Sequence, residues 1–274
     1  MKKNTVVIEP QPGWRIVNLQ ELREYKDLFY FLVWKNIKVR YAQSVLGVGW
    51  AIIQPLFSMV VFTVIFGNLA KVGSDGAPYA LFSFVALVPW TYFSNSLLDT
   101  TGSLVTNRSM LTKIYFPRLI FPFTSVLSKL VDFTISLFVL AILMVWFGVV
   151  PTMGIVVIPL LIVLMMFTAA GLGMWLSALA VQFRDIKYGL NFGIQLLMYS
   201  APVVYPASLI PEKYQLFYAI NPMVGIIEGF RSALLGTNPM PWDFILIGTF
   251  SSVIIIISGA FYFKRMERYF ADVA

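Results

Sequence analysis

The chain reads Phe133-TISLFVLAILMVWFGVVPTMGIVVIPLLIVLMMFTAAGLGMWLSALAVQ-Phe183 over 51 consecutive residues that carry no charge. A helix that crosses the hydrocarbon core of a membrane needs about 20 mostly apolar residues. The stretch is therefore long enough for two crossings. It indicates an integral membrane protein built from helices, and the other spans follow by working outward from it.

A short connection divides this stretch. The segment 148–154 contains two glycines and a proline, which break a helix. Only 15 uncharged residues precede it, so the helix before it must begin earlier and include Lys129 and Asp132 near its end. We predict transmembrane helices at 127–147 and 155–181.

The remaining gaps between charges predict four more crossings, at 48–67, 78–98, 188–205 and 244–263. A further apolar segment, Tyr214–Ile227, has only 14 residues and contains Asn221-Pro222. This length suits a re-entrant element better than a full crossing, and we predict one at about 211–236. The predicted fold class is thus an all-α integral membrane protein with six transmembrane helices.

The basic residues indicate the orientation. Six crossings place 16 of the 20 Lys and Arg residues on the side of the N-terminus, and basic segments stay in the cytoplasm. We predict a cytoplasmic N-terminal segment at 1–46, a transmembrane domain at 47–264 and a cytoplasmic tail at 265–274. The net charge of +7 then reflects membrane topology, and no nucleic-acid partner is expected. The absence of a signal-peptide core near the N-terminus predicts that the mature chain begins at Met1.

An amphipathic helix is predicted before the first crossing. Asn18 and Glu21 have the spacing of a capping box. Apolar side chains follow at helical spacing, at Leu22, Tyr25, Phe29 and Leu32. Basic residues supply the other face, so we expect this helix to lie in the headgroup plane and contact membrane lipid. An ordinary solvated helix is the alternative.

The sequence offers no enzymatic machinery. It has no Cys and no His, which removes thiolate chemistry, the commonest general base and the commonest metal ligand. It also lacks the G-x-x-x-x-G-K-[ST] motif of a P-loop. We therefore expect no catalytic, cofactor-binding or metal-binding residues in this chain.

Two pairs of charges lie at membrane depth, where ionisable residues are costly and often functional. Lys129 and Asp132 are three residues apart, and so are Glu228 and Arg231. The spacing predicts that each pair forms an ion pair on one helix face. A proton relay at the first pair and contact with substrate at the second are the alternatives.

Five stretches resemble the permease subunit of ABC-type polysaccharide exporters, the group that serves O-antigen, capsule and teichoic acid. They are Arg40-YAQSVLGVGWAIIQP-Leu56, Trp90-TYFSNS-Leu97, Leu111-TKIYFP-Arg118, Val181-QFRDIKYGLNFGIQLLMYSAPVVY-Pro206 and Asn221-PMVGIIEGFRSALL-Gly236. The resemblance implies a homodimer of this chain with two copies of a P-loop ATPase subunit, which would hold ATP and Mg. It implies an undecaprenyl-linked glycan as cargo, moved from the cytoplasmic to the outer face of the bacterial inner membrane.

The segments 100–118 and 182–187 are then the candidate contacts with the ATPase. The expected interface residues are Asn107, Arg108, Leu111, Lys113, Ile114, Tyr115, Phe116, Arg184 and Asp185. Its apolar and aromatic members are expected to be exposed, because such anchors with a basic rim suit a protein interface. A membrane-surface helix held by anionic lipid is the alternative.

Aromatic residues near span ends are candidates for the glycan path, because sugars stack on aromatic faces. We expect this role for Trp90, Tyr92, Tyr199 and Tyr205. Aromatic belts at the membrane surfaces are the alternative explanation. Two other functions stay open: an ABC exporter of drugs or lipids, and an integral membrane transferase that acts on lipid-linked sugars.

Overall fold

The protein is mainly helical in the part of the chain that the computed structural model describes, residues 23–42, 47–111, 113, 116–267 and 270. Five helices in these ranges are long and apolar enough to cross a membrane. They are Gly49–Leu69, Tyr79–Thr106, Ile120–Phe147, Met153–Gln182 and Trp242–Met266. The predicted all-α integral membrane fold is therefore confirmed.

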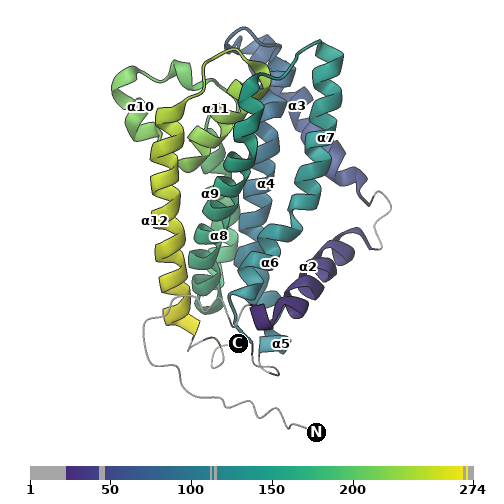
Figure 1. The fold of residues 1–274 in the computed structure, drawn as a ribbon, viewed down its shortest axis with the longest axis vertical. Helices are drawn as coiled ribbons and strands as arrows, with labels where there is room; N and C mark the ends of the chain where they lie inside the picture. The colour runs from purple at the N-terminus through teal and green to yellow at the C-terminus, as the bar shows by residue number, and fades with distance from the viewer. Residues whose placement is uncertain (1–22, 43–46, 112, 114–115, 268–269, 271–274) are drawn as a thin grey trace.

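Figure 1 shows the helices as one bundle, with α2 set at an angle to the long helices. The elements are α2 Lys26–Tyr41, α3 Gly49–Phe62 with its π-helical continuation η1 Thr63–Leu69, α4 Tyr79–Thr106, α5 Arg108–Leu111, α6 Ile120–Ser128, α7 Leu130–Phe147, η2 Met153–Val157, α8 Ile158–Gln182, α9 Asp185–Tyr199, η3 Ala207–Leu209, α10 Glu212–Tyr218, α11 Pro222–Leu235 and α12 Trp242–Met266. We call the two ends of the bundle the α5 end and the α10 end.

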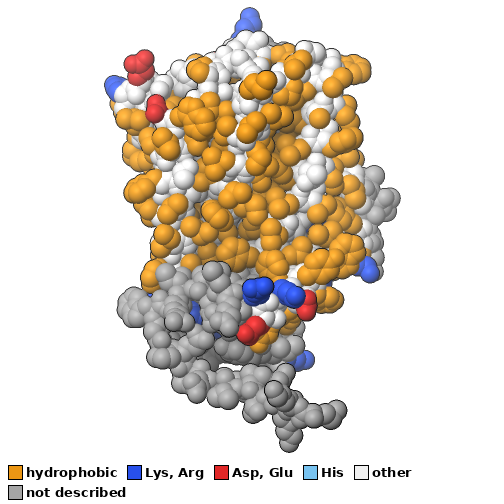
Figure 2. Space-filling view, in the orientation of Figure 1, with side chains coloured by type: hydrophobic (Ala, Val, Ile, Leu, Met, Phe, Trp, Pro, Cys, Tyr) orange, Lys and Arg blue, Asp and Glu red, His pale blue; other side chains and the backbone are white. Residues whose placement is uncertain are grey.

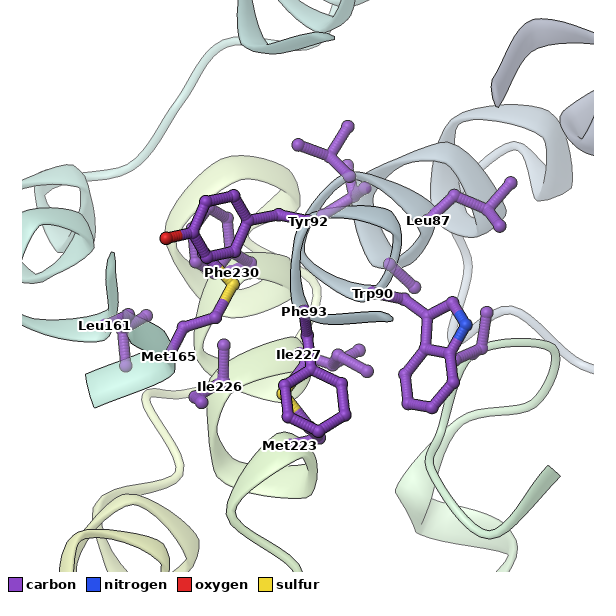
Figure 3. Close-up of a cluster of buried hydrophobic side chains, with 14 of the residues drawn as sticks. Leu87, Trp90, Tyr92, Phe93, Leu161, Met165, Met223, Ile226, Ile227 and Phe230 are labelled. Carbon is purple, nitrogen blue, oxygen red and sulfur yellow. The ribbon is translucent and has the colours of Figure 1, made fainter. Parts of the chain in front are cut away.

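Helix α4 forms the centre of the bundle. Of its most apolar part 78% is buried, against 6% for the span that begins with α3. Figure 3 shows side chains of α4 packed among those of α8 and α11. A small residue of α8 allows a close contact with α4, because a Cβ atom on Gly173 would lie 2.7 Å from the Cβ atom of Thr100.

The outer surface of the bundle suits lipid. Figure 2 shows apolar side chains along the length of one face, with the visible Lys, Arg, Asp and Glu side chains near the two ends. Trp146 and Val145 of α7 are more than four-fifths exposed. An apolar band between charged ends is the pattern of a membrane-spanning bundle.

The predicted crossings at 48–67, 155–181 and 244–263 agree with the structure, whereas the bounds of the others differ. The second was predicted to end at residue 98, but α4 continues to Thr106. Asp99 remains in this helix because its carboxylate pairs with Arg40 and Lys129. The third was predicted to begin at residue 127, whereas the span begins at Ile120 and comprises α6 and α7.

The fifth predicted crossing, 188–205, is only partly a regular helix. Helix α9 has 15 residues, which is about 22 Å at 1.5 Å per residue and less than the roughly 30 Å of hydrocarbon. Turns follow it from Ser200 to Tyr205. Irregular backbone at membrane depth needs partners within the protein, and Arg231 supplies two of them, as shown below. Five long spans are thus observed, and a sixth crossing by α9 and its extension stays a prediction.

The predicted N-terminal amphipathic helix is present as α2, although its proposed capping box lies outside the described residues. Leu32 is buried and packs in a cluster with side chains of α4, α5, α6, α8 and α12. Tyr30, Phe31 and Trp34 are exposed on its other side. The helix itself is confirmed, and its placement among lipid headgroups stays a prediction.

The predicted re-entrant segment is a pair of helices, α10 and α11. Pro222, the first residue of α11, lies beside Gly248 of α12, about two turns into that helix. At the other end of α11, the carbonyl of Ala233 accepts hydrogen bonds from Thr152 at the α10 end. The segment therefore enters the bundle and returns to the end where it began.

We predict that both ends of this segment face the cell exterior. Cysteines introduced as Lys213→Cys and Thr237→Cys in this Cys-free chain should both react with a membrane-impermeant thiol reagent added to intact cells. Lys187→Cys, an exposed position at the other end of the bundle, should react only after the cells are permeabilised. Reaction at only one of the first two positions would mean that the segment crosses the membrane.

Candidate functional site

Helix α9 carries an exposed stripe of polar and aromatic side chains along its length. Tyr188, Asn191, Gln195 and Tyr199 follow one another at intervals of three or four residues, and all four are exposed. At 100° per residue they lie on one face of the helix. We call them the α9 stripe. Side-chain amides are costly to place in hydrocarbon, even though that of Asn191 donates to the carbonyl of Lys187 at 3.3 Å. This face therefore suits an aqueous path or a second protein surface better than lipid.

The neighbouring faces of α9 differ from the stripe. Leu190 and Ile194 are buried against the bundle, and α9 packs on α4 and α8. Phe192 and Leu196 form an exposed apolar row beside the stripe. The polar residues are thus confined to one part of the exposed surface, which provides a matched apolar row for comparison.

Asn191 and Gln195 were not among the residues predicted from the sequence. The fifth crossing was predicted from its lack of charges, and uncharged polar residues do not enter that criterion. The signal was present, because an Asn and a Gln four residues apart share a helix face with Tyr188 and Tyr199.

The structure does not bring the four predicted path residues together. Trp90 and Tyr92 are both buried in the core, where they extend from α4 in different directions (Figure 3). The Tyr92 hydroxyl donates to the carbonyl of Val126 at 3.0 Å, and the Trp90 ring packs against Phe93. Both side chains thus have packing roles within one protomer, and their place on a glycan path stays a prediction.

Tyr199 and Tyr205, in contrast, are neighbours. The Tyr205 hydroxyl donates to the carbonyl of Tyr199 at 2.9 Å, and the Tyr218 hydroxyl donates to that of Tyr205 at 3.1 Å. Tyr199 is 55% exposed. These tyrosines join the end of α9 to α10, and they extend the α9 stripe toward the α10 end.

Glu228 and Arg231 form the predicted ion pair, with 2.8 Å between Oε1 and the guanidinium Nη1 atom. Both are buried. Arg231 also donates to the carbonyls of Val203 and Tyr205 at 3.0 and 3.3 Å, and its guanidinium lies 3.5 Å from the centre of the Phe82 ring. The pair therefore fixes the irregular segment after α9 to α11.

The other predicted pair, Lys129 with Asp132, is wrong. Lys129 pairs with Asp99 of α4 at 2.9 Å, and Asp132 pairs with Arg40 of α2 at 2.8 Å. The prediction assumed one unbroken helix, but α6 ends at Ser128 and α7 begins at Leu130. Lys129 lies at this joint, where the two charges find partners on other helices.

Arg40 connects these two pairs, because its second nitrogen lies 2.9 Å from Asp99. Its neighbour Tyr41 donates a hydrogen bond to Asp132. Burial, together with the bond to this carboxylate, raises the pKa of the Tyr41 hydroxyl to about 12, so the group remains a donor at physiological pH. We call Arg40, Asp99, Lys129 and Asp132 the α2 charge cluster.

The α5 end presents several of the predicted ATPase-contact residues. Arg108, Lys113, Arg184 and Asp185 are exposed there. Asn107 is half-buried and accepts a hydrogen bond from Lys35 of α2 at 3.2 Å. The segments after α4 and after α8 thus present charged side chains at the same end of the bundle.

The expectation of exposed apolar anchors is wrong for Leu111 and Phe116. Both are buried in the cluster that includes Leu32 and Phe121. Helix α5 packs against this apolar cluster, to which α2 contributes Leu32. The buried side chains of Leu111 and Phe116 therefore hold the segment in place. Ile114 and Tyr115 lie outside the described residues.

Comparison with known proteins identifies the family. The model of the ABC-2 type transporter family matches residues 27–235. The chain belongs to this family. That range includes nearly all of α2, the α9 stripe and both helices of the re-entrant segment, so most of the features described above lie within the region that matches the family.

Similar proteins include two named O-antigen export system permease protein RfbA. The one from Klebsiella pneumoniae is 27% identical over 248 residues, which cover 90% of this chain and 95% of the relative. The one from Myxococcus xanthus is 27% identical over 256 residues, which cover 93% of this chain and 98% of the relative. The polysialic acid transport protein KpsM of Escherichia coli is 22% identical over 242 residues, which cover 85% of this chain and 91% of the relative.

Proposed function

We propose that this chain is the permease subunit of an ATP-driven exporter that moves a lipid-linked polysaccharide across the bacterial inner membrane. The relatives named for O-antigen export align with more than nine-tenths of their own length. The similarity thus extends over the transmembrane bundle and the re-entrant segment, and it supports the same kind of cargo for this chain.

The α9 stripe is the structural observation that supports a glycan path. A polysaccharide needs hydrogen-bonding groups and flat apolar surfaces along its way, and the stripe has the amides of Asn191 and Gln195 between two tyrosine rings. The stripe is open in a single protomer. A second copy of the chain, with its own stripe turned toward the first, would enclose a polar path between two α9 helices.

Energy for transport would come from a separate subunit. The chain lacks a P-loop motif, so ATP and Mg²⁺ would be held by two ATPase subunits. The exposed charges at the α5 end, Arg108, Lys113, Arg184 and Asp185, are the surface we assign to that contact. Leu111 and Phe116 would support this surface indirectly, because their buried side chains hold the α5 turn in place. Both termini would then be cytoplasmic, since the α5 end also contains the end of α12.

The test replaces the amides of the α9 stripe. Asn191→Leu combined with Gln195→Leu removes two groups that hydrogen-bond with sugar, each worth about 1 kcal/mol, so we expect export to fall on the order of tenfold. The amount of protein in the membrane should stay the same, because both side chains are exposed. The measurement is the quantity of polysaccharide at the cell surface.

The matched control lies on the adjacent row of α9. Phe192→Leu combined with Leu196→Ala alters two exposed apolar side chains and should leave export close to that of the unchanged protein. Equal export by both double variants would remove the α9 stripe from the path. A loss of protein from the membrane in the amide variant would show that the stripe serves assembly instead.

A further inference from the structure

The α2 charge cluster joins three parts of the molecule through alternating charges. Each of two guanidinium nitrogens of Arg40 contacts a carboxylate from a different helix, Asp99 of α4 and Asp132 of α7. Lys129 at the joint between α6 and α7 contacts the same Asp99. Arg40 lies in the last turn of α2, so this one side chain ties the end of α2 to two helices of the bundle.

The four charges sum to zero. Three of them lie on partly exposed side chains, whereas the side chain of Lys129 is only 10% exposed. The side chains of Arg40 and Asp132 are each 22% exposed, and that of Asp99 is 42% exposed. Ion pairs that remain partly hydrated are weak, because water competes with each partner and stabilises the separated charges. They are readily broken and formed again.

The ion pair in the re-entrant segment shows the contrast. The side chains of Glu228 and Arg231 are 8% and 3% exposed, and separating them would leave two charges buried without partners. That pair suits a permanent connection. The two ion pairs of Arg40 have similar distances, but both partners in each are more exposed, which makes their separation less costly.

The position of the cluster matters as much as its exposure. Helix α2 contacts the bundle through α6 and an apolar face that includes Leu32. Its polar contact with Asn107 connects it to the predicted ATPase-contact segment after α4. A connection that opens at the end of α2 would therefore change how α2 lies against the joint between α6 and α7 and against the α5 end.

We propose that the α2 charge cluster is a reversible latch, which holds α2 against the bundle and releases it when the two move relative to each other. Arg40 is its positioning residue, because it alone contacts both carboxylates among the described residues. The role of this release in transport rests on the proposed function. The latch itself concerns the contact between α2 and the bundle, and it is tested without any transport assay.

The experiment measures whether Arg40 keeps the buried face of α2 protected. Leu32→Cys introduces one thiol into the Cys-free chain at a position that is 2% exposed. The full-length chain in lipid nanodiscs is treated with a water-soluble maleimide, and the rate of modification is followed. Adding Arg40→Gln breaks two partly exposed ion pairs, so we expect the rate to rise about tenfold.

Three further variants make the result specific. Lys38→Gln removes an equal charge from the same turn of α2, outside the cluster, and should leave the rate at Leu32→Cys unchanged. Arg40→Lys retains the charge but lacks the planar fork that reaches two carboxylates, so it should restore protection only in part. Met174→Cys, in α8 of the same apolar cluster, should stay protected when Arg40→Gln is added.

The latch is overturned if the maleimide modifies the thiol of Leu32→Cys no faster in the presence of Arg40→Gln than in the presence of Lys38→Gln. It is also overturned if Met174→Cys becomes reactive together with Leu32→Cys, because Arg40 would then stabilise the whole bundle. Two results together would support the latch and count against the proposed function. The first is release of α2 in this assay, and the second is an unaltered amount of cell-surface polysaccharide in a strain that lacks the gene.

Discussion

Replacing Arg231 with methionine is expected to lower the stability of the protein more than any other single change considered for this chain. The substitution leaves the Glu228 carboxylate buried without its cation and removes the donor to the carbonyls of Val203 and Tyr205. Removing one partner of a buried ion pair costs about 3–5 kcal/mol, which is a large part of a typical stability of about 5–15 kcal/mol. The measurement is the thermal midpoint of the detergent-solubilised protein, followed by size-exclusion chromatography after heating.

Two comparisons separate this effect from a general loss of positive charge. Lys213→Met removes an exposed cation from the neighbouring α10 and should change the midpoint little. Glu228→Gln combined with Arg231→Met should recover part of the loss, since no unpaired carboxylate remains. If Arg231→Met is as stable as Lys213→Met, the pair does not fix the segment after α9.

The positions of the long helices could be predicted from sequence because the membrane imposes a simple requirement. About 20 apolar residues are needed for each crossing, and the charged residues of this chain are few, so the gaps between them locate most spans. The spans at 155–181 and 244–263 correspond to Met153–Gln182 and Trp242–Met266. Counting charges fails where a charge has a partner inside the bundle, as Asp99 has in α4.

Ion pairs were harder to predict than helices. The spacing of three residues was sufficient for Glu228 and Arg231, which lie in the unbroken helix α11. The same spacing failed for Lys129 and Asp132, because Lys129 lies at the joint between α6 and α7 and Arg40 is brought from far away in the sequence. Nothing in the local sequence indicates that α2 ends beside this joint.

The candidate site shows a similar limit. A list of aromatic residues near span ends cannot distinguish Tyr92, which is buried in the core, from Tyr199, which is exposed. Burial depends on which face of α4 or α9 meets the other helices, and that is a property of the assembled bundle. A search for uncharged polar residues on one helix face would have found Asn191 and Gln195 from the sequence.

Deletion of the gene is expected to have the largest effect on the cell. If this chain is the only route for the polymer, none should reach the surface, while synthesis on the cytoplasmic side continues. Undecaprenyl-linked polysaccharide should therefore accumulate inside the cell. Reintroducing the unchanged gene should restore the surface polymer, and the variant with Asn191→Leu and Gln195→Leu should restore it only in small part.

The measurement that tests the proposed function most directly is the amount of lipid-linked polysaccharide inside and outside the deletion strain. Cells are extracted for undecaprenyl-linked polymer and, in parallel, stained for surface glycan before and after the gene is reintroduced. We predict accumulation inside together with loss outside, both reversed by the gene. An unchanged surface glycan with no internal accumulation, in a strain without another exporter for it, would contradict polysaccharide export and favour an exporter of drugs or lipids.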